Sequence, residues 1–123
     1  MGVSFLLFYS RRQYMSYSIS FRAKLDGVDQ WVNVGDYIKH SSNIGRIIRP
    51  VLGFGLVELD GKNTMSICPV ITSCIKQLAS NKQYYRQFET GYESSDVEHT
   101  IEFLRQILDN CLDYPTAIIE ISN

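Results

Sequence analysis

The chain has 123 residues, of which 45% are hydrophobic and 20% are charged, and its formal net charge is −1. This length suits one domain, and the composition excludes an intrinsically disordered or membrane-spanning chain. No strongly basic cluster occurs, which argues against a nucleic acid polymer as the partner.

The charges are nevertheless distributed unevenly. Residues 1–49 contain seven Lys or Arg and three Asp or Glu, whereas residues 96–123 contain one Arg and six Asp or Glu. A basic end and an acidic end in one chain suit a homo-oligomer or a charged protein partner. The simpler interpretation is that the charges solvate opposite faces.

The N-terminal segment, residues 1–14, is separate from the pattern that follows. Val3 to Tyr9 is apolar, but a bilayer-spanning helix needs about 20 residues. Arg11 and Arg12 follow the apolar run, whereas a signal peptide has its basic residues before it. We therefore expect residues 1–14 to be a leader, an extra edge strand or a disordered tail, residues 15–123 to form a single domain, and the protein to be cytoplasmic with no membrane partner.

Three segments are expected to form strands. Residues 17–25 alternate apolar and polar side chains, which is the period of a half-buried strand. Asp26 and Gly27 form a turn, and residues 30–38 pair back as a hairpin. Residues 116–121 are β-branched and apolar, so we expect a closing strand that returns to the hairpin.

The middle of the chain is expected to be mostly helical. A short helix is predicted over residues 43–49, ending or kinking at Pro50, and residues 56–59 are ambiguous and include a possible strand. Pro69 suits the first turn of the next helix, whose apolar stripe is Ile71, Cys74, Ile75 and Leu78. The polar, Tyr-rich segment 81–93 follows, and we expect the helix to continue briefly into this segment until Gly91 breaks it. The last helix begins with a capping box from Ser95 to Glu98, carries a stripe from Val97 to Cys111, and stops at Tyr114. The order predicts an α+β fold in which an antiparallel sheet, made of the N-terminal hairpin and the C-terminal strand, has two or three helices on one face.

No residue pattern predicts catalysis, a cofactor or a metal site. The three cysteines, Cys68, Cys74 and Cys111, lack metal-ligand spacing and are expected to be buried small hydrophobic residues. His99 is expected to be a solvated helix residue. An enzyme that uses His40 with Asp36 is the least favoured class, and we predict a binding protein.

One candidate binding site lies near the predicted short helix. His40 and Asn43 flank the expected helix start, where free backbone donors attract anions, although the same residues suit a helix cap. Arg46 and Arg49 are three residues apart and share a face, so they could clamp a phosphate or carboxylate, or pair with the acidic C-terminal helix. The ligand of such a site would be a small anionic nucleotide.

A second candidate is a protein interface around the last helix. The aromatic segment that precedes this helix is either cover for the core or an interface of the kind Tyr favours. The predicted interface residues are Tyr84, Tyr85, Tyr92, Asp96, Glu98 and Glu102.

Several short pieces, taken in order, resemble a family of small uncharacterised proteins encoded in phage and prophage genomes. The resemblance covers about residues 15–122, and its pieces are Tyr17-Ser-Ile-Ser-Phe21, Asn43-Ile44, Leu59-Asp-Gly-Lys62, Pro69-Val-Ile71, Tyr92-Glu93, and Phe103-Leu104 through Cys111 to Pro115 and Ser122. Gly45 to Pro50 replaces a more regular helix of the family. The resemblance implies a non-enzymatic protein that inhibits a bacterial defence system by binding a defence protein or by sequestering its nucleotide messenger. The alternative is an immunity-type or regulatory module that blocks a toxin or another protein.

Overall fold

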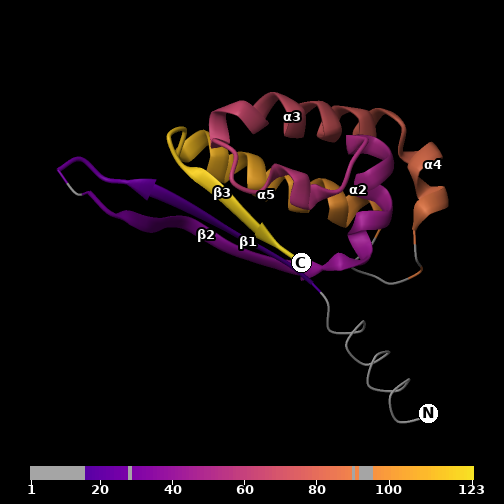
Figure 1. Cartoon of the computed structure of the whole chain (residues 1–123). Coiled ribbons are helices and arrows are strands. Elements are labelled where there is room, and N and C mark those ends of the chain that lie inside the picture. The colour runs from indigo at the N-terminus through magenta and orange to yellow at the C-terminus, as the bar shows by residue number, and fades with distance from the viewer. Residues whose placement is uncertain (1–15, 28, 90, 92–95) are drawn as a thin grey trace, which may run out of the picture.

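The structure is a computed structural model that describes residues 16–27, 29–89, 91 and 96–123 (Figure 1). The expectation for residues 1–14 lies outside the described residues. The elements follow in the order β1 (Ser16–Lys24), β2 (Trp31–Ser41), η1 (Ser42–Ile44), α2 (Gly45–Leu52), η2 (Leu56–Leu59), α3 (Thr64–Ser80), α4 (Lys82–Tyr85), η3 (Arg86–Phe88), α5 (Val97–Asp113) and β3 (Ile118–Ser122).

The three strands form one antiparallel sheet in the order β2-β1-β3. Alternate residues of β1 are buried, as its sequence period predicts, because only one face of the strand meets the core. The C-terminal strand pairs with β1, and it does so over Ser18 to Arg22. The α+β prediction, with an antiparallel sheet built from the hairpin and the closing strand, is confirmed.

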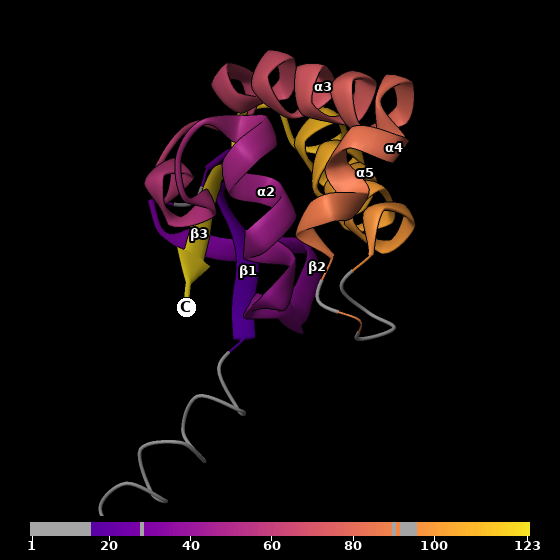
Figure 2. The ribbon, with the colours of Figure 1, turned by 90° about the vertical axis from the view of Figure 1, so that its right-hand side faces the viewer.

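The described helices cover one face of the sheet, and none of them covers the other face. Figures 1 and 2 show α2, α3 and α5 on the same side of the strands, and the tip of the β1–β2 hairpin extends beyond them. The buried side chains of the sheet and of the helices form one core, which includes Ile19, Phe21, Ile71, Leu104 and Ile119. The predicted stripes of α3 and α5 are therefore the faces that pack on the sheet and on each other.

A bulge interrupts the pairing of β1 with β2. Ile19 lies opposite Ile38 and Phe21 lies opposite Val34, so Gly35, Asp36 and Tyr37 all face the single residue between them on β1. Gly35 has a φ of +65°, a conformation that costs little only for glycine. The bulge turns the strand locally without moving Val34 or Ile38 off the core face.

Pro50 and Pro69 both lie inside helices, which corrects two predicted boundaries. α2 continues through Pro50 to Leu52 and ends at Gly53, whose φ is +91°. α3 begins at Thr64, with the Asn63 side chain accepting a hydrogen bond from the Met65 amide, so Pro69 lies beyond the first turn. Each proline removes one helical hydrogen bond, but both are exposed, and their neighbours Val51 and Ile71 are buried. Packing of the apolar face outweighs the local proline rule.

Three smaller expectations also differ from the structure. Leu56–Leu59 forms a 3-10 helix, because both leucines point into the core from one turn, and it is not a strand. α3 ends at Ser80, and a separate short helix and a 3-10 turn follow and end at Phe88. The N-cap of α5 is Asp96, whereas the predicted cap Ser95 lies outside the described residues.

Candidate functional site

The open face of the sheet carries the larger of two surface depressions, about 410 Å³ in volume. Outward-pointing residues of all three strands, together with the turn before α3, form its wall. The lining residues are Ser18, Ser20, Tyr37, Asp60, Glu120, Ile121 and Ser122. The charged residues among them are both acidic, so this depression disfavours an anionic ligand.

A second depression of about 230 Å³ adjoins the first, and Glu120 lines both. Arg22, Trp31 and Ile118 complete it. The Arg22 guanidinium and the Glu120 carboxylate form a cross-strand ion pair at 3.4 Å. The two depressions therefore lie next to each other on the face that the described helices leave uncovered, with basic and acidic groups side by side.

Two aromatic side chains stand on this otherwise polar face. Tyr37, in the β2 bulge, is 68% exposed, and Trp31, at the start of β2, is 41% exposed. The Lys24 ammonium lies 5.5 Å from the centre of the Trp31 ring, which is a cation–π geometry. We define the open sheet face as Ser18, Ser20, Arg22, Trp31, Tyr37 and Glu120.

None of the site residues predicted from the sequence belongs to the open sheet face. The alternation in residues 17–25 already indicates which side chains of β1 point away from the core. The one tryptophan of the chain follows the hairpin turn. What the sequence could not indicate is that all the helices that the structure describes pack on the opposite face.

The predicted anion site is only partly assembled. Arg46 and Arg49 are exposed on α2, and within the described part of the chain neither guanidinium lies within ion-pair distance of a carboxylate. His40 points elsewhere, because its ring packs edge-on against Phe103 of α5 with 5.1 Å between ring centres. Asn43 lies in the 3-10 turn before α2, where its backbone N–H donates a hydrogen bond to Ser41 Oγ at 3.3 Å. The alternative pairing of Arg46 or Arg49 with α5 is thus not seen among the described residues.

Among the described residues, no hydrogen bond joins the Asp36 and His40 side chains. The Asp36 carboxylate accepts a hydrogen bond from the side-chain amide of Asn110 at 3.0 Å, and His40 Nδ1 lies 3.1 Å from the Ser41 carbonyl oxygen. Each side chain therefore has a local structural role.

The predicted protein interface divides into exposed and structural residues. Tyr84 is 59% exposed on α4, and Glu102 is exposed on α5. Tyr85 is only 7% exposed, and its ring meets that of Tyr84 edge-on with 5.0 Å between centres. Tyr85 is a core residue, which corrects its assignment to an interface, and Tyr92 lies outside the described residues.

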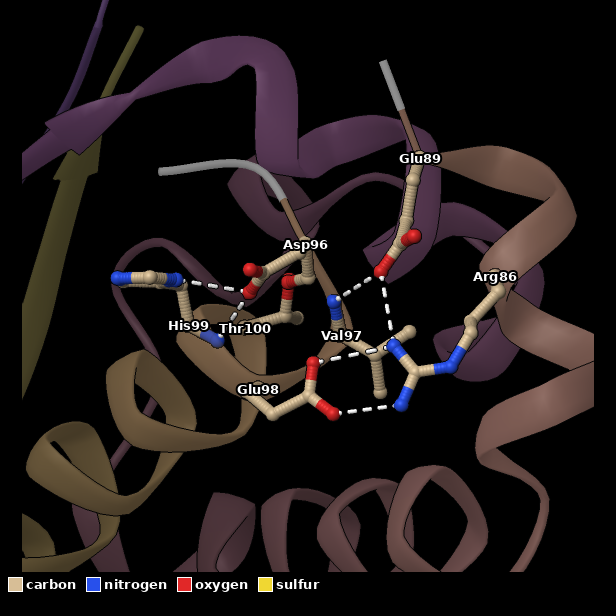
Figure 3. Close-up of polar contacts among 7 residues, drawn as sticks. All are labelled: Arg86, Glu89, Asp96, Val97, Glu98, His99 and Thr100. Carbon is tan, nitrogen blue, oxygen red and sulfur yellow. Dashed lines mark hydrogen bonds and ion pairs between the residues drawn. The ribbon is translucent and has the colours of Figure 1, made fainter. Parts of the chain in front are cut away.

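Asp96 and Glu98 serve local structure at the start of α5 (Figure 3). Asp96 Oδ1 accepts a hydrogen bond from the His99 amide at 2.8 Å and lies 2.8 Å from His99 Nδ1. Glu98 accepts two bonds from the Arg86 guanidinium, at 2.6 and 3.2 Å. Arg86 also bonds Glu89, whose carboxylate accepts from the Val97 amide at 3.0 Å. These contacts tie η3 to the first turn of α5.

The ionisation of these carboxylates follows from the same contacts. The side-chain bond to Arg86 is the main reason why the pKa of Glu98 falls to about 2. Partial burial works against ionisation of Asp96, but the bonds from the His99 amide and ring outweigh it and lower the pKa of that carboxyl overall. Both groups are thus held as anions by structural partners.

Within residues 16–27, 29–89, 91 and 96–123, no group of three or more His, Cys, Asp or Glu side chains could hold a metal ion. Over the same ranges, no helix has the length and apolar character needed to cross a membrane.

Comparisons with known proteins gave no match of any kind. No family model matches the sequence, no curated protein matches it, and no solved structure matches the fold. The resemblance to a phage protein family therefore stays a prediction.

Proposed function

We propose that this chain is a non-enzymatic binding protein that contacts a protein partner through its open sheet face. The observation that carries the proposal is the exposure of Trp31 and Tyr37 on a face that none of the described helices covers. Tyr and Trp are the residues that most often dominate the energy of protein interfaces, because each buries a large rigid surface at low entropic cost.

The charges of the face favour a protein over a nucleic acid or a nucleotide. Arg22 and Glu120 stand side by side, and Asp60 lines the larger depression. A phosphate-rich ligand would meet these carboxylates, whereas a protein surface of mixed charge can pair with both signs. The binding class predicted from the sequence is kept, but the open sheet face replaces the acidic helix as the principal surface.

The partner class follows from the sequence resemblance alone. We propose a bacterial defence protein as the partner, so that binding would block the defence system. If the protein instead sequesters a nucleotide messenger, the binding residues would be Arg46 and Arg49. Both are exposed and have no ion-pair partner among the described residues.

A second protein-binding surface is supported by the exposed side of α5. Four acidic residues and one arginine lie exposed along this helix: Glu98, Glu102, Arg105, Asp109 and Asp113. An immunity-type protein would place such a face over the basic active site of a toxin. Charge reversal in Glu102→Lys/Asp109→Lys changes this face without touching the open sheet face.

The test is phage infection of bacteria that carry defined defence systems, with the chain expressed in the same cells. The chain is expected to restore plaque formation against at least one system, and Trp31→Ala/Tyr37→Ala is expected to abolish this effect. Tyr84→Ala is the control, since it removes another well exposed tyrosine, which lies on α4 and away from the open sheet face. With the purified defence protein, the double variant should bind at least about tenfold more weakly.

Each other outcome contradicts a stated part of the proposal. If Arg46→Ala/Arg49→Ala fails to restore plaque formation while Trp31→Ala/Tyr37→Ala still restores it, the protein acts by nucleotide capture and not through the open sheet face. Loss only in Glu102→Lys/Asp109→Lys would move the interface to α5. No restored plaques with any system, together with protection of cells from a co-expressed toxin, would overturn the defence-protein partner and favour the immunity alternative.

A further inference from the structure

The N-terminal end of α3 is fixed against the C-terminal end of α5. Thr64 Oγ1 donates a hydrogen bond to the Tyr114 carbonyl oxygen at 2.5 Å, and the Thr64 amide donates to the Ala117 carbonyl oxygen at 2.9 Å. Figure 1 shows the two helices side by side above the sheet. Since the start of one helix lies at the end of the other, the two helices run antiparallel where they touch.

This register brings two cysteines to the same level of the helix pair. Cys68 lies four residues after Thr64 on α3, and Cys111 lies three residues before Tyr114 on α5. Three or four residues are one helical turn, so each cysteine stands one turn inward from the Thr64–Tyr114 contact and on the same side of its helix. The Cys68 side chain packs against the core, and the Cys68 thiol is close enough to Cys111 to contribute to the raised pKa of the Cys111 thiol.

The two thiols are free and differ in their access to solvent. Cys111 is fully buried, whereas Cys68 is partly exposed. Burial, followed by the neighbouring Cys68 thiol, raises the pKa of Cys111 to about 12. A solvent-borne oxidant therefore meets Cys68 first, because Cys111 is neither accessible nor readily ionised.

We propose that Cys68 and Cys111 are an oxidation site that closes into a disulfide between α3 and α5 in the presence of hydrogen peroxide. The Cys68 sulfur attacks one peroxide oxygen, the O–O bond breaks, and Cys68 becomes a sulfenic acid as one water is released. The Cys111 sulfur then attacks the sulfenic sulfur, an S–S bond forms, and a second water leaves with the Cys111 proton. Two thiols are oxidised by two electrons, and one peroxide is reduced to two waters.

The third cysteine lies elsewhere on α3. Cys74 is six residues beyond Cys68, which is about 9 Å along the helix axis, and it is buried in the neighbourhood of Tyr85. It is therefore further from Cys111 than a disulfide bond can reach without movement of a helix.

The bond would join two helices that are far apart in the chain. It would close a loop that contains most of α3, all of α4 and η3, and most of α5, which reduces the freedom of the unfolded chain and stabilises the folded state. This inference concerns the packing of the helices and does not depend on the proposed partner of the open sheet face.

The first test is intact-mass spectrometry of the full chain after treatment with hydrogen peroxide. A mass loss of about 2 Da, removed again by a thiol reductant, is expected from loss of two hydrogens. Trypsin would release residues 63–76 and 106–123, because no Lys or Arg interrupts either segment. In Cys74→Ser, the first peptide holds Cys68 alone, so a cross-link between the two peptides identifies the bond.

Controls separate the proposed bond from other oxidation products. Cys111→Ala should accumulate a Cys68 sulfenic acid that dimedone traps, and Cys68→Ser should show no mass loss. The oxidised Cys74→Ser protein should melt at least about 5 °C above its reduced form. A disulfide-linked dimer, a Cys68 sulfinic acid without a cross-link, or unchanged thiols in the Cys74→Ser protein would each overturn the proposal.

Discussion

Asn110 in the last turn of α5 holds the backbone and the side chain of Asp36 in the β2 bulge, although 74 residues separate the two in the chain. Asn110 Oδ1 accepts a hydrogen bond from the Asp36 amide at 2.8 Å. Asn110 Nδ2 donates to Asp36 Oδ2 at 3.0 Å and to the Gln106 carbonyl oxygen at 2.9 Å. The amide group is almost completely buried, so these bonds fix how the bulge sits on α5 and place the next residue, Tyr37, on the open sheet face.

Asn110→Ala is expected to lower the free energy of unfolding by about 1–3 kcal/mol, because the Asp36 amide would lose its side-chain acceptor in a partly buried site. Urea denaturation at neutral pH measures the effect. Gln106→Ala is the matched control, since this exposed side chain bonds the same Asp36 carboxylate at 3.5 Å. Equal losses in the two variants would show that Asn110 does not hold the bulge.

Gly35→Ala is expected to be more destabilising than an ordinary glycine replacement. Gly35 has a φ of +65°, and an added Cβ would collide with Asn110 Oδ1 and touch the Tyr114 ring. The positive φ alone costs roughly 1–2 kcal/mol, and the collision adds to it. Gly27→Ala isolates the first cost, because Gly27 has a φ of +79° and open space around its Cα. In urea denaturation, Gly35→Ala should lose at least about 1 kcal/mol more than Gly27→Ala, and similar losses would mean that the bulge moves away from α5.

The sequence predicted those parts of the fold that depend on a repeating pattern. The strict alternation of residues 17–25 gave the buried face of β1, and the apolar stripe from Val97 to Cys111 gave the buried face of α5. Each pattern is set by the geometry of its own element. The same patterns gave the fold class, because strands at both ends of the chain with helices between them allow few arrangements.

Contacts between distant residues were not predictable in the same way. Gly35 and Asp36 lie inside the strand that is predicted over residues 30–38, and nothing near them in the sequence indicates that Asn110 provides their partner. The helix boundaries predicted from Pro50 and Pro69 were wrong, because burial of the apolar residues near each proline compensates for its missing hydrogen bond. The candidate site residues were unpredictable for the same reason. Tyr84 and Tyr85 are indistinguishable in the sequence, but the packing of α4 buries Tyr85 and leaves Tyr84 exposed.

The Arg86–Glu98 pair gives a pH-dependent prediction. The pKa of Glu98 is about 2 in the folded chain and has a reference value of 4.5. A carboxyl group whose pKa falls on folding stabilises the folded state at pH values above its unfolded pKa. That contribution decreases as the pH falls from 4.5 and is lost once the pH passes below 2. The contribution is lost because the Glu98 carboxylate becomes protonated in the folded state.

Glu98→Gln is therefore expected to lower the melting midpoint at neutral pH, and the difference from the unmodified chain should narrow below about pH 4.5 and vanish near pH 2. The effect should be small, because the pair is exposed and salt screens it. Glu102→Gln is the control, since this exposed carboxylate of α5 forms no ion pair within the described ranges of the chain. Thermal melts of the three proteins at several pH values measure the difference. If the gap for Glu98→Gln stays constant from neutral pH to about pH 2, the pair does not stabilise the start of α5 through its charge.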